Sequence, residues 1–298
     1  MIKIKRVELL LAIGALFFMK PVNAQLLWKV ECDSCAQPSY LFGTYHNIGG
    51  KYIGEHLSVA QIAFKVDAIV TESERAAYKE QEFVSPDSFL TKVPLNMLLD
   101  SADYSMAKDT FTKYFILPFD SVKYMNPLSL EVALRYARES YRLYANKLKP
   151  DSIIAIPMDE SFKKIAIGRK ILLYALDEPG SLDRMKNKEI PLAEQAQMMM
   201  IELKGPADKQ LYHVWDSCYH ANDLYCICNS EAGAMTHSRP GDSILLTKRN
   251  MLWMEKIPAL IQKQSTLIAV GAMHLCGNDG LLNLLYRKKY KLTPLANK

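Results

Sequence analysis

Two apolar, strand-like segments near opposite ends of the chain each end in the pattern Gly-x-x-His. The first, LFGTYH, holds Gly43 and His46, and the second, LIAVGAMH, holds Gly271 and His274. Histidine nitrogens bind divalent metals and transfer protons near neutral pH. Glycine three residues earlier lets the backbone turn, or lets a second backbone or a ligand approach closely. The pattern therefore indicates two histidines placed at strand ends for chemistry.

A third strand-like segment, DAIVTESE, ends in the acidic residues Glu72 and Glu74. Polar residues at the carboxyl ends of buried strands point into the crevice where open α/β sheets bind ligands. His46, His274 and Glu72 thus form a candidate metal site with an open position for water. Glu74 alternates with Glu72 along the strand, so one of the two is expected to face solvent or an ion-pair partner. Taken singly, each histidine could also be a satisfied structural polar group.

The elements around these residues predict an α/β (α+β) fold, with a central mixed β-sheet flanked by helices. Residues 26–31 and 39–46 are expected to form a hairpin, followed by a helix over 56–66 and a buried strand over 67–74. The helix presents Leu57, Ala60, Ile62 or Ala63, and Phe64 as its apolar face.

The middle of the chain, from about residue 85 to 262, is predicted to be mostly helical because its apolar residues recur at a period near 3.6. A strand over 170–178 interrupts it, and Pro258 is expected to kink the last long helix. A buried strand, a helix and a short strand close the chain. The helices are expected over 94–115, 127–148, 158–169, 180–204 and 242–263, and the closing elements over 265–274, 280–290 and 291–295.

Composition indicates a globular chain, with 49% hydrophobic and 23% charged residues among 298. Residues 1–24 have the basic, apolar and cleavage regions of a secretory signal peptide. Without this leader, 33 basic and 31 acidic residues leave a net charge of +2. We expect a single domain over 25–298, exported to the periplasm or secreted, with no transmembrane segment and no nucleic-acid partner. The sequence leaves the oligomeric state open.

Six cysteines follow the leader, and an even number in an exported chain favours disulfides, although six cysteines allow fifteen pairings. Cys32 and Cys35 are expected to form a structural bridge in a loop, the alternative being a redox pair. A zinc knuckle built from Cys218, His220, Cys226 and Cys228 is a weaker alternative, because the spacing fits no standard finger. The sixth cysteine is Cys276.

The order of these motifs resembles the TraB/GumN family, which includes the Tiki proteases more distantly. The opening LLWKVE…PSYLFGTYH…VDAIVTESE and the close KRNMLWMEKIPALI…VGAMHLCGNDG…YKLTPL carry the likeness, which covers essentially the whole chain after the leader. The resemblance implies a fold similar to erythromycin esterases and the haem-binding ChaN group. In the Tiki branch it implies a metal-dependent peptidase.

The resemblance assigns the family's histidines to His46 and His274, its strand glutamate to Glu72, and its Arg-Asn pair to Arg249 and Asn250. The family often has Gly-Leu-Glu after its middle strand, where this chain has Ala-Leu-Asp ending in Asp177. The shorter acid leaves a role for Asp177 open. Trp253, one turn after Arg249, is expected to be a core residue.

We therefore expect a metal-dependent hydrolase, acting on a peptide or small-molecule substrate, that uses Mn²⁺, Co²⁺ or Zn²⁺. Glu72 would be a metal ligand or the general base. Arg249 would stabilise an oxyanion or hold a substrate carboxylate, the alternative being a salt bridge on the helix surface. The alternative is a non-catalytic exported protein that binds a peptide or haem, for which Tyr45 and Met273 stand next to the motif histidines. A Soret band on haem titration distinguishes the two.

Overall fold

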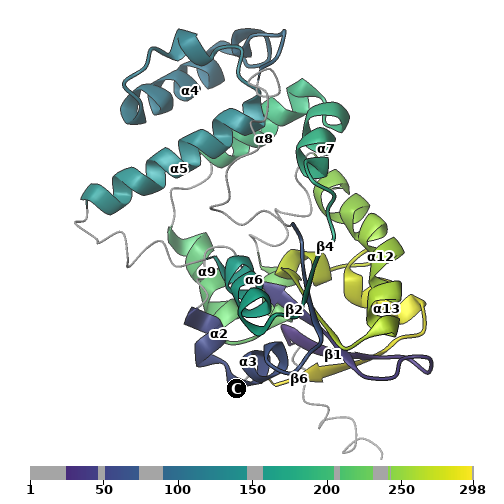
Figure 1. The fold of residues 1–298 in the computed structure, drawn as a ribbon. Helices are drawn as coiled ribbons and strands as arrows, with labels where there is room; N and C mark the ends of the chain where they lie inside the picture. The colour runs from purple at the N-terminus through teal and green to yellow at the C-terminus, as the bar shows by residue number, and fades with distance from the viewer. Residues whose placement is uncertain are drawn as a thin grey trace, which may run out of the picture.

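A six-stranded sheet forms the centre of the structure, a computed structural model that describes residues 25–45, 51–73, 90–145, 157–204, 209–230, 241 and 243–296. The strands lie in the order β4-β3-β5-β2-β1-β6 (Figure 1). Neighbours among β4, β3, β5 and β2 are parallel, whereas β1 is antiparallel to β2 and to β6. The predicted hairpin and mixed sheet are confirmed. The strands are β1 Leu27–Glu31, β2 Ser39–Thr44, β3 Ala68–Thr71, β4 Leu172–Ala175, β5 Thr266–Gly271 and β6 Lys291–Leu295.

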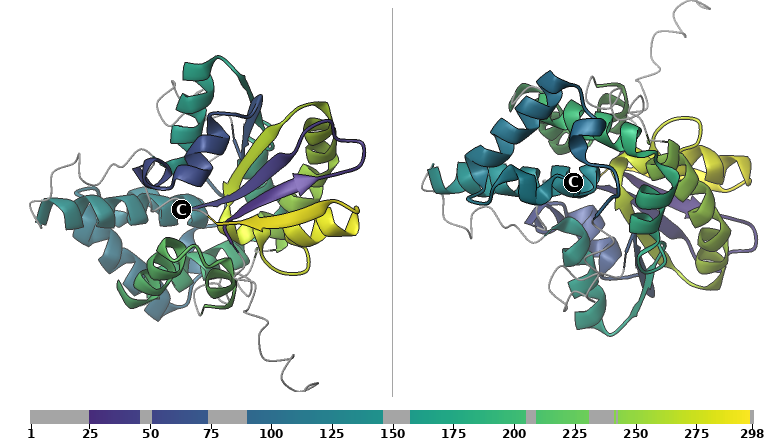
Figure 2. Two further views of the ribbon diagram at one scale, coloured as in Figure 1. Left: turned by 90° about the horizontal axis from the view of Figure 1, so that it is seen from below. Right: turned by 90° about the horizontal axis from the view of Figure 1, so that it is seen from above.

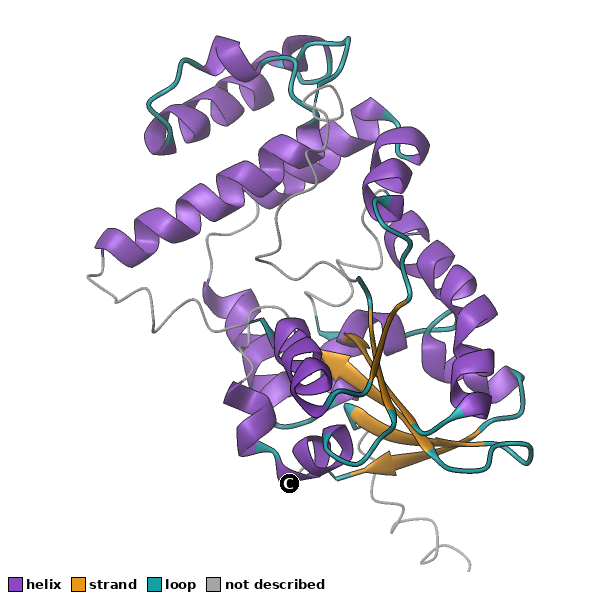
Figure 3. Ribbon diagram, viewed as in Figure 1, coloured by secondary structure: helices purple, strands orange, loops and turns teal. Residues whose placement is uncertain are grey.

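The central strands are buried on both faces, as continuous apolar runs in parallel sheets usually are. Every residue of β3 is buried, and so are the first five residues of β5. The helices α3 (Leu57–Ala63) and α6 (Met158–Arg169) lie on one side of the sheet. On the other side lie α12 (Arg249–Lys263) and α13 (Leu281–Arg287), as Figures 1 and 3 show. A short helix, α2 (Lys51–Glu55), precedes α3 and was not predicted.

The predicted apolar face of α3 is right only in part. Ala63 of that face is fully buried and Ala60 and Ile62 pack against the core, but Leu57 and Phe64 are 62% and 59% exposed. Val59, which is fully buried, was not assigned to the face. A helix of seven residues can bury only one narrow stripe against the sheet. The spacing along the chain does not decide which stripe that is.

Three helices of the middle region form a helical arm with its own hydrophobic core. We use this name for α4 (Ser101–Tyr114), α5 (Pro127–Ala145) and α8 (Leu192–Lys204), with the short helices η2 (Leu95–Met97) and η3 (Phe119–Val122). In both views of Figure 2 the arm and the sheet lie on opposite sides of the molecule. The arm's core is a separate cluster of Leu95, Ala107, Phe111, Phe119, Leu130, Leu134, Met199 and Met200.

The helix predicted over 180–204 is two helices, α7 (Ser181–Glu189) and α8, separated by Ile190 and Pro191. Proline has no backbone N–H to donate within a helix, so it commonly stands at a helix start. Two further helices, α9 (Lys209–His220) and α10 (Leu224–Asn229), complete the helical middle.

The long helix predicted over 242–263 changes its geometry partway along. Residues Ser243–Lys248 form the π-helical turn η5, and α12 continues from Arg249 with Pro258 inside it. Short π-helical segments interrupt regular helices and are frequent at functional sites. The change from π to α geometry falls directly before the Arg249-Asn250 pair.

All six cysteines after residue 25 form disulfides, which join Cys32 to Cys35, Cys218 to Cys226, and Cys228 to Cys276. The expected loop bridge is therefore confirmed. The zinc-knuckle alternative is excluded because its three thiols are all bonded to other cysteines. Across the segments placed in this structure, no helix combines the length and apolar character needed to cross a membrane.

Candidate functional site

The four parallel strands end at one edge of the sheet, and a chemically useful residue follows each of them. Thr71 of β3 pairs with Ala269 of β5 and with Ala175 of β4, and Thr44 of β2 pairs with Gly271 of β5. Glu72 follows β3, Asp177 follows β4, and His274 follows β5 in the turn η6 (Ala272–Leu275). β2 leads toward His46, which lies outside the described residues, as does Glu74.

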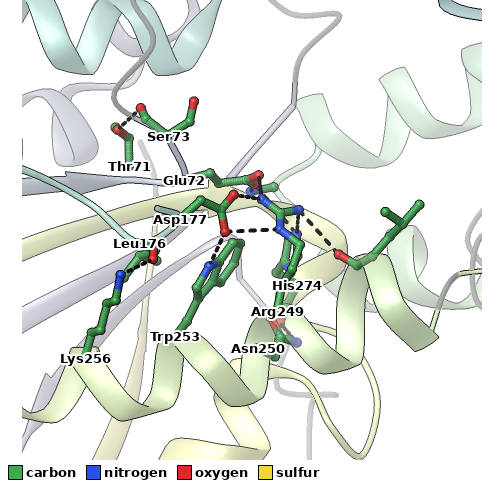
Figure 4. Close-up of polar contacts among 12 residues, drawn as sticks. Thr71, Glu72, Ser73, Leu176, Asp177, Arg249, Asn250, Trp253, Lys256 and His274 are labelled. Carbon is green, nitrogen blue, oxygen red and sulfur yellow. Dashed lines mark hydrogen bonds and ion pairs between the residues drawn. The ribbon is translucent and has the colours of Figure 1, made fainter. Parts of the chain in front are cut away.

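Arg249 is the centre of the polar side chains at this edge (Figure 4). Its Nη2 donates to Oε2 of Glu72 at 2.6 Å and to Oδ2 of Asp177 at 2.7 Å. Its Nε faces Oδ1 of Asp177 at 3.4 Å. Its Nη1 faces Nε2 of His274 at 3.1 Å and the carbonyl of Leu245, in η5, at 3.4 Å. One guanidinium therefore joins residues that follow three different strands.

These contacts use every N–H group of the guanidinium. Arginine has five N–H donors in a planar fork and no acceptor, and the five contacts of Arg249 match that number. In this arrangement Arg249 has no donor left for a substrate carboxylate or an oxyanion. Either of the roles expected from the sequence would require one of these contacts to break.

The charges around Arg249 keep it protonated although it is only 6% exposed. Burial alone lowers the pKa of a guanidinium, because it disfavours the charged form. The negative charges and hydrogen bonds of Glu72 and Asp177 together outweigh burial and raise the pKa of Arg249 above its ordinary value. The guanidinium thus acts as the counter-ion of two carboxylates.

Asn250 fixes the orientation and the tautomer of His274. Its Nδ2 donates to the carbonyl of His274 at 3.1 Å and to the carbonyl of Asp279 at 2.8 Å. Its Oδ1 is then the acceptor for Nδ1 of His274 at 2.8 Å. This network assigns the ring proton to Nδ1 and leaves the lone pair on Nε2, which accepts from Arg249. Asn250 acts through His274 and is a positioning residue.

Both motif glycines stand where a side chain would collide with a neighbour. A Cβ on Gly43 would lie 3.1 Å from Cα of Ala272, the residue directly after β5. A Cβ on Gly271 would lie 3.2 Å from Oε1 of Glu72, which accepts the Gly271 N–H at 2.7 Å. Gly43 therefore allows a close backbone approach, and Gly271 allows the glutamate to reach the strand end.

Asp177 and Trp253 belong to the same network. The indole Nε1 of Trp253 donates to Oδ1 of Asp177 at 2.8 Å. Its ring lies 4.5 Å from Cζ of Arg249 and 4.3 Å from the ring of His274. Trp253 is 1% exposed, so its expected place in the core is confirmed. Its contacts with the site were not predicted. The sequence did carry a signal for Asp177, because an acidic residue follows β4 just as Glu72 follows β3.

The donor chemistry of this edge fits a divalent metal. Nε2 of His274 lies 3.8 Å from Oε1 of Glu72. Two ligands, each about 2.1 Å from a tetrahedral metal, lie about 3.4 Å apart. Nitrogen and carboxylate oxygen suit Mn²⁺, Co²⁺ and Zn²⁺. Among the residues with described positions, no group of three or more His, Cys, Asp or Glu side chains is arranged to hold a metal. His46, the further ligand expected from the sequence, lies outside the described residues.

The order of strands, the motif glycines and the network around Arg249 define a protein of the α/β class with a polar site at the carboxyl edge of its sheet. The model of the TraB/PrgY/gumN family matches residues 26–294. The chain belongs to this family, as the sequence predicted. No curated protein and no solved structure matches the chain.

Proposed function

We propose that this protein is a metal-dependent hydrolase that acts on peptide bonds. The observation that carries the proposal is the arrangement of His274, whose Nε2 is the acceptor nitrogen and lies 3.8 Å from Oε1 of Glu72, while Asn250 holds the opposite ring nitrogen. Metal-binding histidines usually donate their second ring N–H to a fixed acceptor, which sets the ring orientation before the metal arrives. His274 already has this arrangement.

His274 and Glu72 would hold Mn²⁺, Co²⁺ or Zn²⁺ together with His46. The bound ion would lower the pKa of a water molecule and polarise a carbonyl group. Glu72 has two oxygens in different environments, with Oε1 fixed by the Gly271 N–H and Oε2 facing Arg249. This division allows Glu72 to serve as a ligand through one oxygen and as the proton acceptor through the other.

The resemblance to the Tiki branch favours peptide bonds as the substrate class. The three disulfides favour an oxidising compartment, which agrees with an exported protein. Among the residues whose positions are described, no observed contact of Tyr45 or Met273 favours the haem-binding alternative. Tyr45 and Met273 are each 7% exposed, and the ring of Tyr45 packs against Trp215 and Tyr219.

The test is metal binding by the purified protein, measured by elemental analysis and titration calorimetry with Mn²⁺, Co²⁺ and Zn²⁺. Wild type is expected to bind one equivalent, and His274→Ala and Glu72→Gln are each expected to weaken binding at least about tenfold. His220→Ala is the matched control, because this histidine is exposed in the last turn of α9. Thermal unfolding establishes that each variant is folded.

Peptide libraries then test hydrolysis by the metal-loaded wild type and the three variants. Cleavage that is lost in His274→Ala and Glu72→Gln and kept in His220→Ala supports the proposal. A wild-type protein that binds none of the three metals would refute it. A Soret band on titration with haem, without metal binding, would move the function to the binding alternative.

A further inference from the structure

Arg249 contacts both described residues that are proposed to bind the metal, His274 and Glu72. We propose that the guanidinium of Arg249 and the metal ion compete for His274 and Glu72. We further propose that Asp177 is the positioning residue that keeps Arg249 paired once its contacts with His274 and Glu72 are broken. This inference rests on the proposed function, because it concerns the same two ligands.

The competition follows from the lone pair of His274. Nη1 of Arg249 lies 3.1 Å from Nε2, at the hydrogen-bond position of that lone pair. A metal bound to a histidine nitrogen lies about 2.0–2.1 Å from it along the same lone pair. Nη1 and the ion would then be far closer to each other than two cations can stand, so the hydrogen bond must break before the metal binds. Nη2 likewise engages Oε2 of Glu72, at 2.6 Å.

Asp177 offers Arg249 a second place to pair without leaving the site. Nε and Nη2 approach Oδ1 and Oδ2 of Asp177 side by side, at 3.4 and 2.7 Å. Two-point pairing of arginine with a carboxylate is one of the strong charge-assisted arrangements. The contact between Glu72 and Arg249 is made by Oε2, at 2.6 Å. Loss of the Glu72 contact therefore leaves Arg249 paired with a carboxylate whose side chain is 7% exposed.

Trp253 fixes the position of Asp177 and lies against Arg249 in the same arrangement. Its Nε1–H to Oδ1 hydrogen bond orients the carboxylate, and its ring faces the guanidinium at 4.5 Å from Cζ. A cation over an indole face is attracted by the ring quadrupole. In this proposal Arg249 keeps its contacts with Asp177 and Trp253 when the metal binds. Its contacts with Glu72 and His274 are replaced by the metal.

The experiment measures the affinity for Mn²⁺ and Zn²⁺ of Arg249→Gln and Asp177→Asn by titration calorimetry. Arg249→Gln removes the competing cation and is expected to bind at least about tenfold more tightly than wild type. Asp177→Asn leaves Arg249 dependent on Glu72 and is expected to bind about tenfold more weakly. Arg249→Lys keeps the charge without the planar fork and serves as the second variant if Arg249→Gln fails to fold. It is expected to bind more tightly than wild type, since it cannot bridge the same acceptors.

Lys256→Gln is the control for charge alone. Lys256 lies on α12 with Arg249, but it donates to the Leu176 carbonyl at 2.7 Å and pairs with Glu178. Its loss is expected to change metal affinity by less than about twofold, because an exposed charge is largely screened. An affinity gain in Lys256→Gln equal to that of Arg249→Gln would overturn the competition, because it would show a general electrostatic effect.

Tryptophan fluorescence gives a readout that does not depend on activity. Metal binding to wild type is expected to shift the Trp253 emission as the guanidinium rearranges over its ring. The shift should disappear in Trp253→Phe, where Trp28 and Trp215 remain. Wild-type metal binding with no gain in either Arg249 variant would overturn this inference and leave the proposed function intact. Failure of wild type to bind metal would refute the proposed function, and failure of both Arg249 variants as well would overturn this inference.

Discussion

At the scale of single residues, the site depends on the missing side chain of Gly271 as well as on the polar side chains around it. Gly271 has ordinary extended dihedral angles, with φ −50° and ψ 135°, so an alanine there would not strain the backbone. Its Cβ would instead lie 3.2 Å from Oε1 of Glu72 and 3.7 Å from Cδ2 of His274. A substitution at Gly271 therefore tests the position of the glutamate rather than the fold.

Gly271→Ala is expected to lower the free energy of unfolding by about 1–3 kcal/mol, because it disturbs the charge-assisted hydrogen bond to Glu72. Metal affinity should fall by about tenfold, since the carboxylate is displaced from His274. Urea unfolding and calorimetry measure the two effects. Gly168→Ala is the matched control. Gly168 is exposed in α6 with open space around it, and alanine there should stabilise the protein slightly. Unchanged affinity in Gly271→Ala would mean that Glu72 does not bind the ion.

The sequence indicated most residues of this network but not how they pair. Strand-end position identified Glu72 and His274, and the family resemblance added Arg249 and Asn250. Asp177 was left without a role, because no pattern along the chain states that β4 lies beside β3. Residues at 72, 177, 249 and 274 meet only through the order of strands in the sheet, which depends on long-range packing. That packing also determines that every N–H group of the Arg249 guanidinium has a partner.

At the scale of elements, the disulfide between Cys228 and Cys276 joins α10 to the segment that carries His274. Cys276 directly follows η6, two residues after the histidine, and it is 5% exposed. The bridge therefore restrains the turn η6 at its end, directly after His274 and Leu275. It joins cysteines 48 residues apart, whereas the bridge between Cys32 and Cys35 spans only 3.

Replacing both Cys228 and Cys276 by serine is expected to lower the free energy of unfolding by about 4 kcal/mol, because the loop released in the unfolded chain is long. The double variant Cys32→Ser, Cys35→Ser is the control, with an expected loss of about 1.5 kcal/mol from the same loop-entropy relation. Denaturant unfolding under non-reducing conditions measures both. Equal losses would show that the longer bridge does not restrain the unfolded chain as this relation requires.

The sequence predicted the central strands better than it predicted the buried face of α3 or the π-helical turn. The central strands are continuous apolar runs bounded by polar residues, a local signal that survives without knowledge of the fold. The α3 face and the π-helical turn at Ser243–Lys248 carry no such signal. The first depends on how α3 crosses the sheet, and the second on how residues Ser243–Lys248 pack against α7 and η6.

At the scale of the whole molecule, the buried residues of the described part of the chain form two hydrophobic cores of different size. The larger core surrounds the sheet, and the smaller one lies within the helical arm. A smaller buried core gives a lower free energy of local opening. We expect the backbone amides of α4, α5 and α8 to exchange with deuterium faster than those of β3 and β5.

Leu134→Ala tests whether the arm opens by itself. Leu134 is fully buried in the arm's core, and truncation of a buried leucine costs about 2–5 kcal/mol. Hydrogen exchange measured by mass spectrometry should accelerate in the arm and stay unchanged in the sheet. Ile268→Ala in β5 is the complementary variant, which should accelerate both. Equal acceleration of arm and sheet in Leu134→Ala would mean that the two cores unfold as one unit.

The alkaline limit of the fold is expected to depend on a tyrosine beneath the first Gly-x-x-His strand. Tyr219 on α9 is 1% exposed, and its hydroxyl donates to the Gly43 carbonyl at 2.6 Å. Burial, followed by the charges of Tyr52 and Asp159, raises the pKa of Tyr219 well above 10.0. The folded state keeps this proton at a pH where the unfolded chain releases it. The resulting stability is complete below about pH 10 and is lost as the pH rises toward the folded-state pKa.

Tyr219→Phe should therefore have two opposite effects on the free energy of unfolding. At pH 8 it should be lower by about 1–3 kcal/mol, because the Gly43 carbonyl loses its buried donor. Above pH 10 the decline with pH should be shallower than in wild type by up to about 1.4 kcal/mol per pH unit, the contribution of one titrating group. Urea unfolding from pH 8 to 11.5 measures both effects, with Tyr225→Phe, 68% exposed in α10, as the control. Parallel curves for wild type and Tyr219→Phe would place the alkaline instability in other groups and leave Tyr219 only its hydrogen bond to the strand.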